Sequence, residues 1–371
     1  MVKGVAAATL RTAATLNAAM MGPILFLKTN LPRTHGKIEE GLNMKPRSRS
    51  ILVALGLLAG ALPGAHSAEQ PRASDFPTRP IRWIIPFPPG GSNDVLGRYL
   101  GIKLTDRLGQ QVVIDNRGGA NGIIAAQLAA NAPADGYTLL MVSTSFVMNA
   151  AVRPLPYDIE KSFDPISMIG SAPNSIVTHP QRGFGTLREL VDRARAKPAS
   201  VFYAATGIGG FNHFGGELFK KVAGIDMVMV PYKGGGPAMV DVMAGEITIM
   251  FSSLTQVLPH VRTGRLKVLA IGAANRSPVV PDVPTVIESG FPGYEVAVWW
   301  GVAAPAGAPR AVTEKLRREI TAILQEPETK KRLLADAAEP QIMTPDELRT
   351  LIHNDKKKWA DVARQAGIHV Q

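Results

Sequence analysis

The stretch PFPPGGSND, residues 86–94, follows the apolar run IRWII, residues 81–85, and decides the fold that the sequence predicts. A short apolar run indicates a buried strand, and the Pro/Gly cluster after it indicates a turn. Ser, Asn and Asp, which close the stretch, are all favourable N-cap residues for the helix expected over residues 95–108. The segment therefore predicts a strand that passes through a tight turn directly into a helix.

This turn is also a candidate anion site. Gly90 and Gly91 have no Cβ, so the backbone there can approach a ligand closely. The helix that follows would direct N–H groups and the positive end of its dipole toward the turn, an arrangement that binds carboxylates. Taken alone, the segment has an alternative interpretation as an ordinary capped turn without a ligand.

Short apolar strands and amphipathic helices alternate along the rest of the chain. Strands are expected at residues 81–87, 112–115, 138–142, 175–178, 201–204, 227–230, 247–251 and 266–271. Helices are expected at residues 95–108, 121–132, 186–197, 212–223, 237–244, 257–263, 310–325, 327–337 and 345–366. Such alternation is typical of an α/β fold with a mostly parallel sheet.

One pattern recurs four times: a strand ends, a turn rich in Gly, Ser or Thr follows, and a helix begins. It occurs at residues 90–92, 143–145, 206–209 and 234–236. In open α/β sheets, ligands bind outside the carboxyl ends of the strands. We therefore expect these turns to converge on one small anionic ligand.

The N-terminal region reads as a targeting segment. Residues 44–49 are basic, residues 51–62 are apolar, and residues 65–67 supply the small residues of a cleavage site. This combination predicts a signal peptide over residues 44–68, because the apolar run is too short to span a membrane. Residues 1–43 have no coherent pattern and are expected to be a non-native extension, with Met44 as the start; the alternative is a genuine extension that weakens export. The expected location is the periplasm.

Charge and cysteine content narrow the function classes. The 371-residue chain has a net charge of +11, but residues 69–371 hold 33 basic and 28 acidic residues, a net charge of +5. That balance favours small anions over nucleic acid, which we do not expect as a partner. The chain has no cysteine, which excludes thiol catalysis and cysteine-ligated metals.

Catalytic and cofactor motifs are incomplete. Residues 207–209, Gly-Ile-Gly, begin a dinucleotide fingerprint, but Asn212 stands where its third glycine is needed. His213 and Glu217 share a helix face, yet the sequence suggests no third metal ligand. We therefore expect no catalytic residue, no cofactor and no metal, and His213 is expected beside the turn at 206–210 or in a capping or surface role.

Two further features have alternative interpretations. Asp94 is expected to act as a general base, to contact a ligand amine or to cap the first helix, and capping is the simplest interpretation. Trp299 and Trp300 are expected either to wall a cleft or to pack in the core.

Seven motifs in order resemble the Bug, or tripartite tricarboxylate transporter (TctC-like), family of periplasmic substrate-binding proteins. They are PIR before PFPPGGSND, LGQ before VVIDNRGG (residues 112–119), DGYTLL (135–140), LPYD (155–158), VPYKG (230–234), PDVPT (281–285) and APAG (304–307). The resemblance covers about residues 76–371.

The resemblance implies a two-domain, type II-like periplasmic binding fold that closes on a ligand in the cleft between its domains. Domain 1 is expected at residues 69–172 plus 297–371 and domain 2 at residues 173–296, with hinge crossovers near 170–175 and 293–298. The family usually binds a small organic acid, whose carboxylate is held largely by backbone N–H groups and ordered waters.

The expected ligand-binding residues lie in the recurring turns and beside them. They are Phe87, Gly90, Gly91, Ser92, Asn93, Asp94, Ser143, Thr144, Asn149, Thr206, Gly207, Gly209, His213, Lys233 and Gly234. The chain departs from the family pattern at Phe211 and Phe214, where smaller or aliphatic residues are usual, and these rings are expected to narrow the cleft.

The leading hypothesis is a monomeric solute-binding protein that captures a di- or tricarboxylate for the membrane subunits of a tripartite tricarboxylate-type transporter. A ligand sensor that presents its closed form to a signalling protein is one alternative. A hydrolase that uses the same cleft is another, because a catalytic triad is defined by geometry and need not show in sequence.

Overall fold

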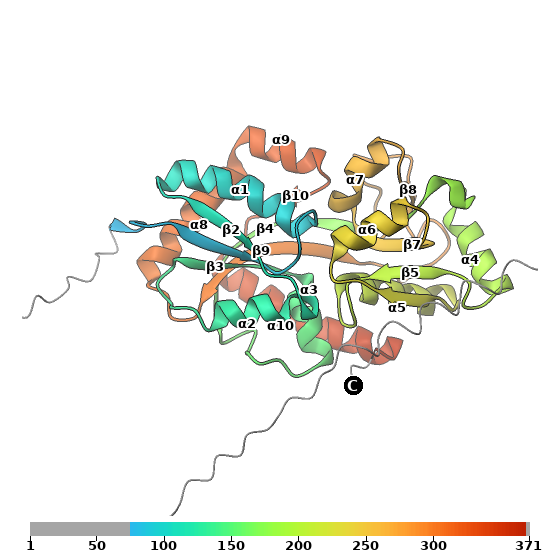
Figure 1. The fold of residues 1–371 in the computed structure, drawn as a ribbon, viewed down its shortest axis with the longest axis horizontal. Helices are drawn as coiled ribbons and strands as arrows, with labels where there is room; N and C mark the ends of the chain where they lie inside the picture. Colours follow the sequence, from blue (N-terminus) through green and yellow to red (C-terminus); the bar gives the residue numbers. More distant parts are fainter. Residues whose placement is uncertain (1–74, 369–371) are drawn as a thin grey trace, which may run out of the picture. The chain divides into compact units, whose positions relative to one another are not determined.

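One long strand, β4 (Phe163–Thr178), runs through both halves of a ten-stranded sheet in the computed structural model (Figure 1). The structure describes residues 75–368. The expected extension (1–43), signal peptide (44–68) and cleavage site therefore lie outside the described residues.

The strands follow the order β2-β1-β3-β9-β4-β7-β5-β6, and β10 and β8 each pair with β4. Their bounds are β1 Ile81–Ile85, β2 Val112–Asn116, β3 Thr138–Ser143, β5 Phe202–Ala205, β6 Val228–Pro231, β7 Ile249–Ser253, β8 Lys267–Ile271, β9 Ala297–Pro305 and β10 Glu339–Pro340. We call β1, β2, β3, β9 and β10 with their helices the first half, and β5 to β8 with theirs the second half.

The α/β class is confirmed, but the expectation of a mostly parallel sheet is wrong. Four pairings are parallel: β1 with β2 and β3, and β5 with β6 and β7. Five pairings are antiparallel, and each involves β4 or β9. The reason is that these two strands carry the chain between the halves and enter each sheet against its parallel strands.

β4 changes partners along its length. Residues 163–173 pair with β9, whereas residues 174–178 pair with β7 and β8. At the change, Asn174 N donates to Val296 O at 2.9 Å, just before β9 begins. The two connections between the halves therefore run side by side at 173–174 and 296–297.

Helices cover both faces of each half. In the first half, α1 packs with α8 on one face, while α3 packs with α10 and α2 contacts β1 and β3 (Figure 1). In the second half, α5 and α6 each contact β5 and β7, and α7 contacts β7. The bounds are α1 Ser92–Leu108, α2 Ile123–Ala130, α3 Thr144–Val152, α4 Leu187–Ala196, α5 Phe211–Ala223, α6 Gly235–Met243, α7 Leu254–Arg262, α8 Arg310–Gln325, α9 Pro327–Ala335 and α10 Pro345–Ala366, with short 3-10 helices at Ala120–Gly122 and Pro180–Arg182.

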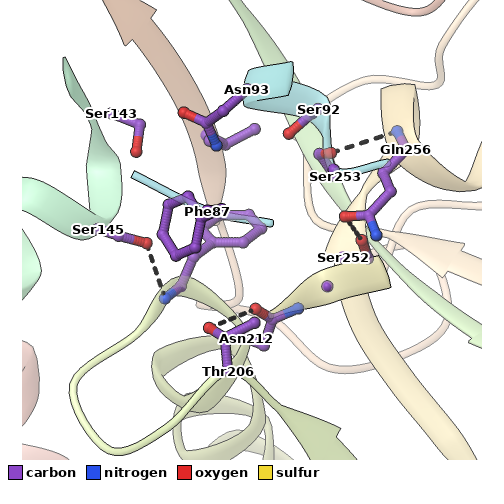
Figure 2. Close-up of a pocket in the computed structure, with 14 residues that line it drawn as sticks. Phe87, Ser92, Asn93, Ser143, Ser145, Thr206, Asn212, Ser252, Ser253 and Gln256 are labelled. Carbon is purple, nitrogen blue, oxygen red and sulfur yellow. Dashed lines mark hydrogen bonds between the residues drawn. The ribbon is translucent and has the colours of Figure 1, made fainter. Parts of the chain in front are cut away.

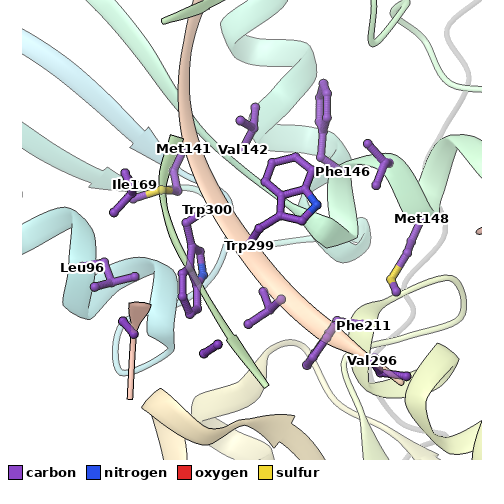
Figure 3. Packing of buried hydrophobic residues seen from close by; sticks show 14 of the residues in the cluster. Leu96, Met141, Val142, Phe146, Met148, Ile169, Phe211, Val296, Trp299 and Trp300 are labelled. Carbon is purple, nitrogen blue, oxygen red and sulfur yellow. The ribbon is translucent and has the colours of Figure 1, made fainter. Parts of the chain in front are cut away.

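The adjacent tryptophans of β9 pack in the main hydrophobic core (Figure 3). Trp300 is fully buried, and Trp299 donates its indole N–H to Asp355 Oδ2 at 2.7 Å. Each aromatic side chain of this size buries about 150–250 Å². The core interpretation of this pair therefore holds, and β9 is fixed between the halves by its own side chains.

Candidate functional site

A small cavity of about 40 Å³ lies where five helices of the two halves begin (Figure 2). The starts of α1 and α3 approach it from the first half, and those of α5, α6 and α7 from the second. Fourteen residues line it: Phe87, Gly91, Ser92, Asn93, Ser143, Ser145, Thr206, Phe211, Asn212, Gly235, Ser252, Ser253, Gln256 and Val298. At about 10–15 Å³ for each water, the cavity has room for roughly three waters.

Four of the five helices start without a side-chain cap. Their N-cap residues make no side-chain hydrogen bond to the first turn; they are Gly91, Ser143, Gly210 and Gly234. Only in α7 does a cap form, where Ser253 Oγ accepts from Gln256 N at 3.3 Å. The first N–H groups of a helix have no partner within the helix, so uncapped starts can leave them available to an anion. In α5 the first of these, Phe211 N, is already used, since it donates to Ser145 Oγ at 3.3 Å.

None of the fourteen lining residues carries a formal charge. One side-chain donor is free for an anion, because Gln256 Nε2 is buried without a partner in the structure. Asn93 Oδ1 is also buried without a partner, but as an amide oxygen it can only accept a hydrogen bond. Gln256 Oε1 is already used, since it accepts from Ser252 Oγ at 3.1 Å. The cavity can therefore hold a negative group by oriented dipoles alone.

Asp94 shapes the first turn from behind and does not line the cavity. Its carboxylate accepts from Gly90 N at 3.0 Å and from Asn116 Nδ2 at 2.9 Å, and it pairs with Arg98 at 2.9 Å. Burial acts to raise the pKa of Asp94, but these hydrogen bonds lower it overall. With its oxygens occupied in this way, Asp94 stabilises the turn before α1. It does not cap the helix, because the N-cap residue is Gly91 and the helix start has no side-chain cap, so the capping interpretation is wrong.

The turn between β5 and α5 joins the two halves beside the cavity. Thr206 Oγ1 bonds to Asn121 Oδ1 at 3.2 Å, and Phe211 N donates to Ser145 Oγ at 3.3 Å. A Cβ on Gly210 would lie 2.7 Å from Asn121 Oδ1 and 2.8 Å from Thr206 Oγ1, so any larger residue there would displace this hydrogen-bonded pair. These contacts hold the start of α5 against the first half.

His213 lies behind this turn, where its Nδ1 accepts from Gly209 N at 3.3 Å. Burial lowers the pKa of His213, which keeps the imidazole neutral near pH 7. Glu217, its expected partner on the helix face, instead accepts from Tyr203 Oη at 2.6 Å. Among residues 75–368, no group of three or more His, Asp or Glu side chains is placed to hold a metal.

The structure brings part of the predicted residue set together. Six of them line the cavity: Phe87, Gly91, Ser92, Asn93, Ser143 and Thr206. Asn149 lines a smaller neighbouring cavity of about 10 Å³, and Gly207 and Lys233 line a wider hollow of about 750 Å³. None of these three cavities is lined by Gly90, Asp94, Thr144, Gly209, His213 or Gly234. Ligand contact remains a prediction for the whole set.

Thr144 shows that a residue in a predicted ligand-binding turn need not face the cavity. Its hydroxyl accepts from Trp299 N at 2.9 Å and faces Ala297 O at 3.4 Å, so it binds β9. Its neighbour Ser145, one residue further, lines the cavity instead. The helix start turns successive side chains by about 100°, which separates their roles.

Eight lining residues are absent from the predicted set: Ser145, Phe211, Asn212, Gly235, Ser252, Ser253, Gln256 and Val298. Of these, Ser145 and Gly235 belong to turns that were expected at the site. A signal for α7 was present, because Ser253-x-x-Gln256 has the spacing of a capping box. Of the two phenylalanines expected to narrow the cleft, Phe211 lines the cavity. Phe214 packs edge-on against Trp359, with ring centroids 5.4 Å apart.

Comparison with known proteins gives one consistent result. Residues 96–368 match the model of the tripartite tricarboxylate transporter family receptor. The chain is 39% identical over 320 residues to Protein BugT of Bordetella pertussis, covering 85% of this chain and 97% of BugT.

Two solved structures share the fold. One is R. palustris Rpa4515 with adipate, at 32% identity and a TM-score of 0.77, covering 79% of this chain and 99% of that one. The other is MatC from Rhodopseudomonas palustris with bound malate, at 30% identity and a TM-score of 0.74, covering 77% and 99%.

Proposed function

Because the chain belongs to the tripartite tricarboxylate transporter receptor family, we propose that it captures a small organic carboxylate for a transporter of that type. The observation that carries this proposal is the meeting of four uncapped helix starts around a cavity without formal charge. Such starts present N–H groups and positive dipole ends, which suit a carboxylate.

The ligand class has support from the relatives. Adipate and malate, bound in the Rpa4515 and MatC structures, are both dicarboxylates. We therefore propose a di- or tricarboxylate for this chain.

We propose that capture uses two domains, residues 69–172 plus 297–371 and residues 173–296. The change of β4 from β9 to β7 and β8 at 173–174 supports the first boundary, and the start of β9 at Ala297 supports the second. Opening about these two neighbouring connections would expose the cavity to solvent.

We propose binding without catalysis. Several serines line the cavity, but no His, Asp or Glu does, so no base stands in the lining to activate a serine. Incubating the protein with candidate acids and their esters, and following both by NMR, would show turnover if the hydrolase alternative were true.

We propose that the protein works in the periplasm as a monomer and hands its ligand to transporter membrane subunits. The expected signal peptide supports export, and within residues 75–368 no helix is long and apolar enough to cross a membrane. Cell fractionation with N-terminal sequencing, and light scattering of the purified protein, test location and oligomeric state.

The decisive experiment for the class of ligand is a thermal-shift screen of organic acids against their uncharged amides. A bound acid stabilises the folded state by mass action, by about 2.7 kcal/mol at a hundred times its Kd. The proposal predicts stabilisation by acids alone. A response to neither series, or an equal response to acid and amide, would contradict it.

A further inference from the structure

The 750 Å³ hollow beside the cavity, which we call the vestibule, is lined by two cationic side chains, Arg153 and Lys233. Thirteen residues line it: Pro88, Pro89, Asn116, Gly118, Gly119, Ala120, Asn121, Arg153, Thr206, Gly207, Ile208, Tyr232 and Lys233. None of them is acidic. Two acids are hydrogen-bonded to this lining from outside it. Asp94, which pairs with Arg98, accepts from Asn116 Nδ2 at 2.9 Å, and Asp241 accepts from Tyr232 Oη at 2.5 Å.

Arg153 has binding capacity that its own chain does not use. It follows α3, and its guanidinium donates to Ile208 O across the gap between the halves. Its Nε is buried without a hydrogen-bond partner, and no ion pair is formed by Arg153 or by the exposed Lys233 within the described part of the chain. Cationic side chains that face a hollow without an ion-pair partner can bind an anionic group of a ligand through charge-assisted hydrogen bonds.

The cavity and the vestibule lie next to each other and share one lining residue, Thr206. Thr206 lines both, and Asn121, to which Thr206 is hydrogen-bonded, also lines the vestibule. The volumes decide how a ligand would fit. About 40 Å³ accommodates a carboxylate group in place of a few waters, whereas the rest of a longer acid needs other space.

We propose that the vestibule is the second compartment of the ligand site, and that it takes the far carboxylate of an elongated dicarboxylate. Arg153 and Lys233 are then specificity-determining residues, which select a second negative charge that the neutral cavity does not require. This inference rests on the proposed function, because it assumes that the first carboxylate enters the cavity.

The test compares acids that differ only in the far group, adipate with hexanoate and suberate with octanoate, by isothermal titration calorimetry. The variants are Arg153→Gln and Lys233→Gln, with Arg349→Gln as the control, because Arg349 is an exposed arginine of α10 outside the vestibule. Losing a charged hydrogen-bond donor is expected to weaken diacid binding by tenfold or more, and monoacid binding by less than twofold.

The outcomes separate the two claims. If the wild-type protein binds no acid, the proposed function fails and the inference with it. If it binds adipate and hexanoate equally well, only the inference fails. Equal losses for diacid and monoacid in Arg153→Gln would mean that Arg153 merely positions the turn at 206–210, which also overturns it. Lys233→Gln provides the same test in a side chain that makes no contact needed for folding.

Discussion

Replacing Gly91 with valine should separate ligand binding from folding. Gly91 has φ −85° and ψ 165°, a conformation that valine adopts readily. A Cβ built there meets nothing nearer than Pro88 O at 4.0 Å, although the residue is buried and lines the cavity. We therefore expect the free energy of unfolding without ligand to change by less than about 1 kcal/mol.

Binding should suffer much more, because the added methyl groups occupy the space through which a carboxylate reaches the start of α1. A hydrogen bond to a charged group contributes about 1.5–3 kcal/mol, so losing even one weakens binding by roughly 10- to 150-fold. At a hundred times the wild-type Kd, ligand stabilises the wild-type protein by about 2.7 kcal/mol. With 100-fold weaker binding, the same ligand concentration gives the variant about 0.4 kcal/mol.

Differential scanning fluorimetry reports this difference directly. At about 2 °C for each kcal/mol in a chain of this size, the ligand should raise Tm by about 5 °C in the wild-type protein and about 1 °C in Gly91→Val. Val95→Ala is the matched control, because Val95 lies in the same helix, is 41% exposed and does not line the cavity. A wild-type Tm shift in Gly91→Val would refute the placement of the ligand at the start of α1.

Three further changes test other parts of the structure. Gly170→Ala would place its Cβ 2.4 Å from Glu339 O, so we expect a loss of about 1–3 kcal/mol in urea unfolding, and an unchanged midpoint would contradict the packing. Because burial lowers the pKa of His213, the unfolded chain binds more protons than the folded chain as the pH drops below 6.5, so the free energy of unfolding should decrease as the pH is lowered. Urea unfolding at pH 7.5 and at pH 5.5 should show a smaller decrease in His213→Gln than in the wild-type protein, and equal decreases would refute this. Thr144→Val leaves the buried Trp299 N–H without its acceptor, so it should cost about 1–3 kcal/mol in stability without changing ligand affinity, and the reverse result in calorimetry would place Thr144 at the ligand.

Most of the helices and parallel strands were predictable because their sequence patterns are local. Residues 310–325 and 345–366 were expected as helices and are α8 and α10 with the same bounds. The connecting strand β4 was expected only over 175–178, because Pro165, Gly170 and Pro173 resemble breaks in a strand. In the structure the register shifts between Pro165 and Ser167 and again between Met168 and Gly170, so irregular pairing absorbs two of these residues. Such pairing depends on β9, more than 100 residues away.

The candidate site was predictable where a glycine-rich turn marks it and less so elsewhere. The turn before α1 was found because glycines and N-cap residues stand together at residues 90–94. The turn before α7 was missed because β7 passes from Ser253 directly into the helix at Leu254, with no Gly or Pro between them. Which side chain at each helix start faces the cavity depends on how five helices from two halves meet, and a local pattern does not contain that arrangement.

The absence of charge around the cavity has a consequence for how a ligand can be identified. The side chains of its lining are those of Phe, Gly, Ser, Asn, Thr, Gln and Val, and none of these gains or loses a proton between pH 5 and 9. Within the cavity, any proton taken up or released on binding in that range must then come from the ligand itself. In His213→Gln, which removes the imidazole bonded to the turn at 206–210, a plot of log Kd against pH should bend at the acid's own ionisation constants, so the protein would report the ionisation of an unidentified ligand.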